Sequence, residues 1–352
     1  MKPHPLRLAV LDVGQGDTIV VSCPATREAI VVDCVDAHGV IDYLKSEGIE
    51  KIRALVLTHL HSDHYRQAVT FLKNCGARLG VECERVVLTP VPPRMPPLDN
   101  DAESFPREFD TLVRWMEENY QRVHGVPTDR HLPVEGELAS QIDFVFPYPA
   151  HMPRAQKRGY NNTSIVLRVQ GSGCSALLTG DIEAAGWELI PRRKFVVEAD
   201  VLKFPHHGAW KDKNGDPADA VQMLNEVGAK VVIFSVGSRQ KGYNHPDAHV
   251  FDAARAAKAT ILCTQATSRC GLISPSDPKK PNAPDKERAL TEPHLISHMK
   301  SIGQPPILCS SGTPCAGTVI IDLEDKPIIL SPNVSVHRKQ IVETIFAARH
   351  QC

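Results

Sequence analysis

The sequence contains no long hydrophobic run. A helix that spans a bilayer needs about 20 consecutive apolar residues, and no stretch of the 352 residues approaches that length. The N-terminal residues MKPHPLRLAVLDVGQGD hold only a short apolar run before they turn acidic, which is not the pattern of a secretory signal. We therefore expect a cytoplasmic protein that makes no contact with a membrane.

The sequence also has almost no net charge. It carries 40 basic and 41 acidic residues, which gives a net charge of −1 at pH 7. Proteins that bind nucleic acid are usually basic, so this balance does not itself indicate such a partner, although a local basic patch or bound metal ions would supply a positive field. In the cytoplasm the ten cysteines would be mostly reduced, and grouped cysteines then indicate metal ligands or core residues rather than disulfides.

A cluster of metal-ligand residue types stands out against this background. An apolar run at 54–57, typical of a buried strand, leads directly into His59, His61, Asp63 and His64. This spacing is too tight for one tetrahedral ion and suits two adjacent ions. His59 and His61 would bind one ion, and Asp63 and His64 the other. The alternative is a surface loop that happens to be polar.

The order of predicted strands and helices indicates an α/β layered fold. Three strands at 6–13, 18–22 and 29–33 form an expected antiparallel meander, and strands and helices then alternate to residue 88 and again from 164 to 263. The proline-rich residues 90–158 interrupt this order, and we interpret them as an insertion that resembles a lid. Its basic loop would either meet an anionic substrate or remain solvated.

Polar side chains recur where the predicted strands end, at Asp33, at Asp181, at His206 with His207, and at His245. Strand ends on one edge of a sheet are where α/β proteins gather their chemistry. Asp33 is either a simple turn carboxylate or an acceptor that orients a metal-binding histidine.

Taken together, these motifs resemble the metallo-β-lactamase fold, an αββα sandwich of two mixed sheets flanked by helices. A finer resemblance, to the ComEC-like branch named for the soluble domain of a DNA-uptake protein, is carried by four motifs in order over residues 6 to about 263. They are DVGQGD at 12–17, NNTSIVL at 161–167, LKFPHHG at 202–208 and YNHP at 243–246.

The resemblance implies a site for two divalent metal ions, zinc or manganese, with six ligands: His59, His61, Asp63, His64, Asp181 and His206. Asp181 would bridge the two ions. The resemblance also places Asp33 where the family keeps an acid that supports a ligand, and Asp17 beside the cluster. His207 is either a supporting residue or the actual ligand in place of His206.

The sequence departs from the family pattern at two places. Asn161 and Asn162 stand where many members have another metal-binding histidine, and an amide oxygen is a weaker ligand for zinc-like ions. The His59/His61 ion would then be held more loosely, completed by water or substrate phosphate, or replaced by a harder ion such as manganese; His131 or His151 is a possible substitute ligand. Bulkier residues after His64 include Arg66, which would either meet a phosphate or be a plain surface arginine.

A dinuclear site of this kind fits hydrolysis of a phosphodiester, and the branch resembled includes a DNA-degrading domain. We therefore expect a metal-dependent phosphodiesterase, most simply a nuclease acting on DNA, with Asp63 and Asp181 in the catalytic centre. His245 would serve as an acid or a phosphate donor, or else as a structural histidine, and Tyr243 would lie near the substrate. By analogy alone, we also expect protein partners from a separately encoded system, for example one that defends against foreign DNA.

Two alternatives use the same residues. A small-molecule hydrolase cutting a lactone, a cyclic nucleotide or another ester is favoured by the near-neutral charge. An inactive metal-bound sensor or interaction module is disfavoured by the intact Asp63, Asp181 and His206.

Residues 264–352 follow the region of resemblance and form an expected C-terminal extension to a domain at 1–263. A hairpin is predicted at 319–330. Four cysteines form two spaced pairs, with His294 and His298 between them: Cys263, Cys270, Cys309 and Cys315. They would form a structural zinc site, although their spacing is wider than usual, or else be buried thiols.

Overall fold

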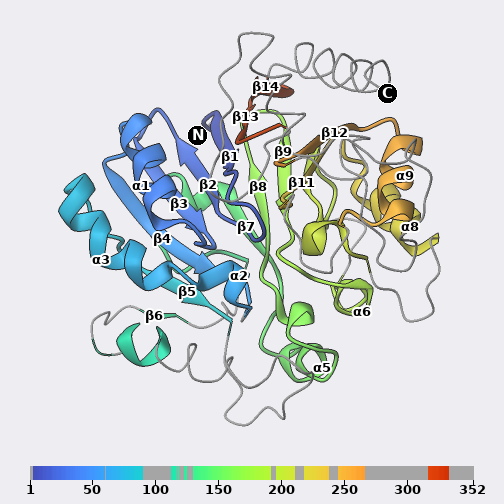
Figure 1. The fold of residues 1–352 in the computed structure, drawn as a ribbon, viewed down its shortest axis with the longest axis horizontal. Coiled ribbons are helices and arrows are strands. Elements are labelled where there is room, and N and C mark those ends of the chain that lie inside the picture. Colours follow the sequence, from blue (N-terminus) through green and yellow to red (C-terminus); the bar gives the residue numbers. More distant parts are fainter. Residues whose placement is uncertain are drawn as a thin grey trace, which may run out of the picture.

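The structure is a computed structural model that describes residues 3–59, 61–89, 112–116, 118, 123–124, 130–191, 196–210, 218–237, 245–265 and 316–332. Two β-sheets lie face to face in the centre, and helices cover their outer faces (Figure 1). This is the αββα sandwich that the sequence predicts, and the fold prediction is confirmed. Most of the first part of the expected insertion, residues 90–129, lies outside the described residues.

The first sheet has eight described strands in the order β14-β13-β1-β2-β3-β4-β5-β6. The predicted N-terminal meander is confirmed, because β1, β2 and β3 pair antiparallel, whereas β4 runs parallel to β3. The strands are β1 (Leu6–Val10), β2 (Ile19–Cys23), β3 (Glu28–Val32), β4 (Lys51–Leu57), β5 (Val86–Leu88), β6 (Val123–His124), β13 (Val319–Leu323) and β14 (Pro327–Ser331).

The second sheet has six strands in the order β12-β11-β10-β9-β8-β7. Strands β9 to β12 are mutually parallel, and β8 and β7 complete the sheet in antiparallel pairing. The strands are β7 (Ile142–Phe146), β8 (Val166–Gln170), β9 (Ser175–Leu178), β10 (Val201–Lys203), β11 (Val231–Phe234) and β12 (Thr260–Cys263).

Helices α1 (Ala37–Ser46) and α3 (Ala68–Leu79) cover the first sheet, and α8 (Ala218–Val227) and α9 (Ala248–Ala256) cover the second (Figure 1). The remaining described helices are short: α2 (Ser62–Tyr65), α5 (Met152–Gln156), α6 (Ala184–Trp187), and the 3₁₀ turns η1 (Ala139–Gln141), η2 (Asn161–Thr163) and η3 (Pro205–Gly208). None of the described helices combines the length and the apolar character that a membrane span requires.

Three hydrophobic layers result, because the central strands are buried on both faces and therefore read as continuous apolar runs. In β1, Leu8 and Val10 belong to the layer between the sheets, whereas Ala9 belongs to the layer under α1 and α3. A third layer packs the second sheet against α8 and α9.

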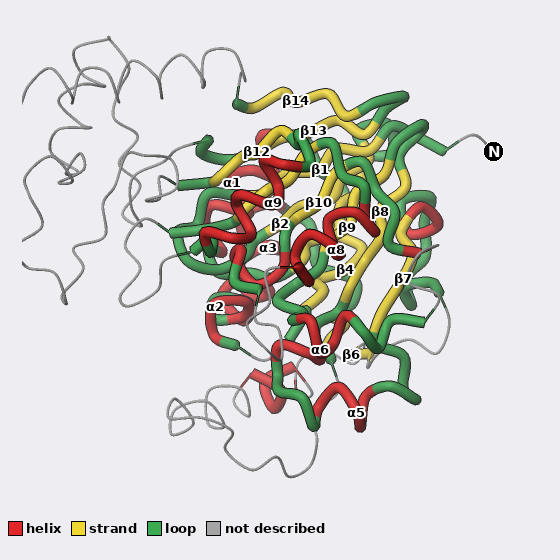
Figure 2. The backbone as a smooth tube through the Cα atoms, turned by 90° about the vertical axis from the view of Figure 1, so that its right-hand side faces the viewer, coloured by secondary structure: helices red, strands yellow, loops and turns green. Residues whose placement is uncertain are grey.

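The predicted C-terminal hairpin is confirmed as β13 and β14, and it is joined to the N-terminal strand. β13 pairs antiparallel with β1, with Leu6 opposite Leu323. Arg7 reinforces this pairing through hydrogen bonds of 2.7 and 3.0 Å to the carboxylate of Asp322. In Figures 1 and 2 the hairpin lies at one edge of the molecule and α5 at the opposite edge. Residues 319–331 thus extend the first sheet of the sandwich.

Polar side chains of both sheets meet at one edge of the sandwich. Asp33 follows β3, the histidine cluster follows β4, Asp181 follows β9, and His206 and His207 follow β10. The carboxyl ends of parallel strands point to the same edge of a sheet, which is why residues far apart in sequence converge there. The amide of Ile165 donates to the carbonyl of Thr58 (2.9 Å) and ties the two sheets together beside this point.

Candidate metal centre

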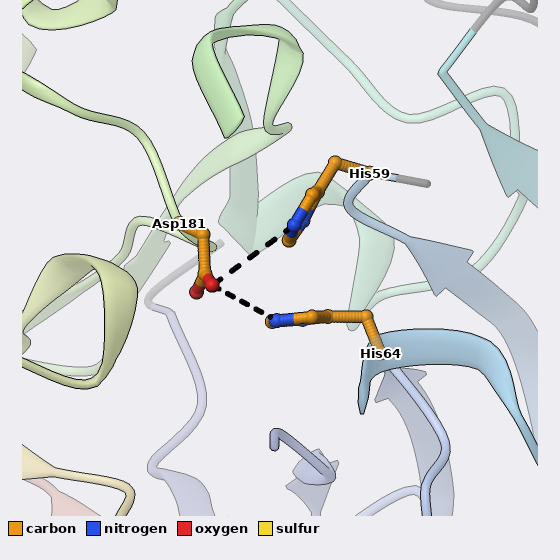
Figure 3. Close-up of side chains that lie close together, drawn as sticks. All are labelled: His59, His64 and Asp181. Atoms are coloured by element: carbon orange, nitrogen blue, oxygen red, sulfur yellow. Dashed lines mark ion pairs between the residues drawn. The ribbon is translucent and has the colours of Figure 1, made fainter. Parts of the chain in front are cut away.

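Two buried histidines converge on one oxygen of Asp181. Oδ2 of Asp181 lies 3.2 Å from Nε2 of His64 and 3.9 Å from Nε2 of His59. Figure 3 shows both histidines reaching toward the aspartate from the loop after β4. The three side chains are buried and their potential ligand atoms lie within 4.8 Å of one another, so this group can hold a metal ion.

A second potential ligand group shares His64 with the first. It consists of Asp63, His64 and His207. Nε2 of His207 lies 3.4 Å from Oδ2 of Asp63 and 3.3 Å from Oδ2 of Asp181. Nε2 of His64 can bind only one ion, whereas the carboxylate of Asp181 faces both groups and could bridge two neighbouring ions.

The chemistry of these atoms fits a cation. Nε2 of His64 and Nε2 of His207 are buried and make no hydrogen bond within the described part of the chain, although buried polar atoms are normally paired. Burial raises the pKa of Asp181, but the imidazoles of His207 and His64 outweigh it and hold that pKa well below its usual value. Burial also raises the pKa of Asp63, but the same two imidazoles outweigh it and lower that pKa. The site thus presents ionised carboxylates and imidazole nitrogens to a common centre.

His207, rather than His206, is the member of its pair that reaches this centre. In η3 both residues adopt left-handed backbone conformations, with φ of 48° and 54°, and their side chains diverge. Nδ1 of His207 lies 2.8 Å from the carbonyl of Ser235, which leaves Nε2 for the cluster. Nδ1 of His206 instead lies 3.4 Å from Oε1 of Glu183. The family pattern places the ligand at His206, and we propose on this geometry that it is His207.

Asp33 has the surroundings expected of an acid that orients a ligand. Its carboxylate accepts from the amide and the hydroxyl of Thr58 (2.8 and 2.7 Å) and lies 2.7 Å from Nδ1 of His64. Burial lowers the pKa of His64, but the carboxylates of Asp181 and Asp33 outweigh it and raise that pKa. With Nδ1 engaged by Asp33, His64 directs Nε2 toward Asp181 and Asp63.

Sequence reasoning missed Lys203. It is the last residue of β10, fully buried, and its ammonium forms an ion pair with Asp17 and donates a 3.0 Å hydrogen bond to the carbonyl of Gly180. Burial lowers the pKa of Lys203, but the carboxylates of Asp17 and Asp181 outweigh it and raise that pKa. The available signal was a lysine inside an apolar strand that leads directly into the histidine pair.

The half of the site around His61 is built differently. Nδ1 of His61 lies 3.1 Å from Nε2 of His59, so the two rings are placed to share an ion. The amide of Asn161 donates to Glu183 (3.1 Å), and that of Asn162 donates to the carbonyl of Arg158 (2.7 Å). Oδ1 of Asn162 accepts from the backbone of Gly186 (2.6 Å), which assigns this side chain to local structure.

The other predicted residues lie outside these groups or outside the described residues. Arg66 is exposed at the end of α2. His245 is partly buried, with its ring 6.0 Å from that of His206 and Nδ1 3.6 Å from Asp247. His131 is exposed, and the ring of His151 packs against Phe146 and Tyr148.

Tyr243 and three of the four cysteines considered for a structural zinc site, Cys270, Cys309 and Cys315, lie outside the described residues. Cys263 is buried at the end of β12. The zinc site therefore stays a prediction from the sequence.

A glycine allows the loop of Asp17 to approach that of Asp63. Gly16 has φ of +119°, and a Cβ at this position would lie 2.2 Å from the carbonyl oxygen of Asp63. The same carbonyl accepts from the amide of Asp17 (3.1 Å). We expect Gly16→Ala to lower the free energy of unfolding by about 3 kcal/mol, because left-handed strain and overpacking add, and to weaken metal binding by displacing Asp63.

Gly48→Ala is the matched control for that substitution. Gly48 also has positive φ, of +64°, but nothing lies within 4 Å of the position of its Cβ. We expect it to cost about 1 kcal/mol from strain alone and to leave metal binding intact. Denaturant unfolding and metal titration measure both effects; equal costs for the two variants would show that the approach to Asp63 carries no constraint.

Comparison with known proteins identifies the family of this chain. A family model, the metallo-beta-lactamase superfamily, matches residues 11–222. ComE operon protein 3 of Bacillus subtilis (strain 168) is 25% identical over 274 residues, which cover 72% of this chain and 31% of that protein. Competence protein ComA of Neisseria gonorrhoeae is 25% identical over 262 residues, covering 73% and 30%. This chain therefore spans less than a third of the length of either relative.

Solved structures with a similar chain course include the short form of human tRNase Z, which is 17% identical with a TM-score of 0.36 and covers 72% of this chain and 95% of its own. The resemblance to the ComEC-like branch that the sequence motifs indicate is confirmed by the two competence proteins. The family match extends over more than half of the chain, and the protein accordingly belongs to the metallo-β-lactamase superfamily.

Proposed function

We propose that this protein is a metal-dependent phosphodiesterase that hydrolyses DNA at a site for two divalent cations. The observation that carries the proposal is the pair of overlapping ligand groups around Oδ2 of Asp181, a carboxylate that could bridge two ions. Membership of the metallo-β-lactamase superfamily supports a metal-dependent hydrolase.

Each described residue has a specific task in this proposal. Divalent cations held here would supply Lewis acidity and lower the pKa of a coordinated water. His59, Asp63, His64, Asp181 and His207 would hold the cations, and Asp33 fixes the direction of the His64 ring. His245, whose ring neighbours that of His206 at the rim, would donate a proton to the leaving oxygen.

The choice of DNA rests on the resemblance to the ComEC-like branch and on a relative that is named as a competence protein. The alternative is a small-molecule ester or lactone hydrolase, which the net charge of −1 favours because it provides little general attraction for a polyanion. Arg66, exposed at the end of α2 and two residues after His64, is a candidate for contact with a phosphate.

The test is cleavage of linear, circular and single-stranded DNA and of RNA, each with manganese, magnesium or zinc. We expect DNA to be cut by the wild type and not by Asp63→Ala. A substrate that makes six or more phosphate contacts should bind about 10³-fold more weakly at 200 mM than at 50 mM salt. Cleavage of a lactone or a generic phosphodiester without cleavage of either polymer would refute the nuclease and favour the alternative.

A further inference from the structure

Lys203 is a positive charge built into the interior of the site. Its side chain is fully buried at the end of β10, where Nζ pairs with Oδ2 of Asp17 and lies 3.6 Å from Oδ1 of Asp181. A buried ammonium without a partner costs several kcal/mol. The two aspartates therefore account for the presence of this lysine, and the lysine in turn constrains them.

Asp17 lies behind the histidines that face the centre of the site. Its carboxylate is 3.9 Å from Nδ1 of His64 and 3.7 Å from Nδ1 of His207, on the side of each ring opposite the Nε2 atoms. Asp17, Asp181 and His207 nevertheless form a third group whose potential ligand atoms lie within 4.8 Å of one another. The ammonium of Lys203 lies against two of these three residues.

The two oxygens of Asp181 have different neighbours. Oδ1 faces Lys203, whereas Oδ2 faces Nε2 of His59, His64 and His207. This division fixes the rotation of the carboxylate, so that a single oxygen is presented to both ligand groups.

We propose that Lys203 is a positioning residue that takes the place of a cation in the Asp17–Asp181–His207 group, withholding Asp17 from the bound metal ions and turning Oδ2 of Asp181 toward them. The proposal rests on the metal-binding role of Asp181 given under the proposed function. The ammonium of Lys203, and not a metal ion, then occupies this third ligand group. Lys203 thereby limits the number of ions that the site accepts.

Charge balance gives the proposal a measurable consequence. Four carboxylates lie in or directly behind the cluster, Asp17, Asp33, Asp63 and Asp181. Replacing Lys203 by the neutral, similarly shaped methionine leaves Asp17 buried without its counter-charge. A divalent cation can then occupy the vacated position between Asp17, Asp181 and His207, because their ligand atoms are already close together.

The experiment measures metal ions per chain by elemental analysis, after equilibration with manganese or zinc and removal of free metal. It compares the wild type, Lys203→Met and the double variant Lys203→Met/Asp17→Asn. We expect Lys203→Met to bind one ion more per chain than the wild type and to gain more in Tm on metal addition. The double variant removes the uncompensated carboxylate and should return to the wild-type count.

An unchanged metal count in folded Lys203→Met would overturn the proposal, as would an extra ion that persists in the double variant. If Lys203→Met fails to fold at every metal concentration while the double variant folds, Lys203 serves only to neutralise Asp17 and no metal replaces it. Failure of both variants to fold would indicate that Lys203 only packs the interior, and would also overturn the proposal. A wild type that binds metal without cutting DNA would refute the nuclease alone, since the metal counts do not depend on the substrate.

Discussion

Asp181→Asn is expected to abolish hydrolysis. The carboxylate of Asp181 faces both proposed ligand groups, through Oδ2 at 3.2 Å from His64 and 3.3 Å from His207. An amide of the same shape removes the negative charge that a divalent cation requires there. Metal ions in hydrolytic sites contribute several kcal/mol of charge stabilisation, so the rate of cleavage should fall by about 10³-fold or more.

The measurement combines steady-state cleavage with metal content, and Asp200→Asn is the matched control. Asp200 precedes β10 at the opposite end of the same strand, where its carboxylate pairs with Lys230 (2.7 Å) and accepts from the amide of Ser175 (3.1 Å). That substitution should change the rate by less than about twofold, because the pair lies away from the ligand groups and an ion pair with an exposed lysine adds little even to stability. Wild-type cleavage by folded Asp181→Asn would remove the site from the mechanism.

His207→Ala and His206→Ala are expected to differ sharply, although the two residues are adjacent. His207 places Nε2 among Asp63 and Asp181, whereas His206 lies beside Glu183 and Asn161. Loss of a residue that merely orients a ligand costs about 10- to 100-fold in metal affinity. Loss of His207 as a direct ligand should therefore cost about 100-fold or more, and loss of His206 less than about tenfold.

Metal titration of the two variants, with circular dichroism to confirm folding, decides whether His206 or His207 binds the ion. The reverse order of affinities would restore the assignment that the sequence motif gives to His206. Equal, small losses in both variants would show that neither imidazole binds the ion directly.

Much of the fold was predictable because a strand that is buried on both faces appears in the sequence as a short apolar run. The second half of β4, residues 54–57, and all of β11 are apolar and buried, and a cluster such as His59 to His64 can follow a buried strand only where the chain leaves the sheet. The convergence of Asp33, Asp181 and the histidines then follows from parallel pairing, which brings the carboxyl ends of strands to one edge.

The rest depended on features that residue type does not encode. The choice between His206 and His207 follows from two consecutive left-handed backbone conformations in η3. The role of Lys203 depends on which face of β10 it occupies and on Asp17, which precedes β2 in the other sheet. Pairing of β13 with β1 joins segments with no local relation, and a hairpin pattern alone does not say which sheet edge it will join.

The pairing of β13 with β1 has a consequence for synthesis of the protein on the ribosome. Arg7 and Asp322, bonded across β1 and β13, are 315 residues apart in the chain. At about 5–20 residues per second, translation leaves the outer edge of β1 without its partner for roughly 15–60 s. An uncovered edge strand is a template for pairing with other chains. The nascent protein thus passes through a period in which its first strand needs shielding, and any truncation ahead of β13 would make that exposure permanent.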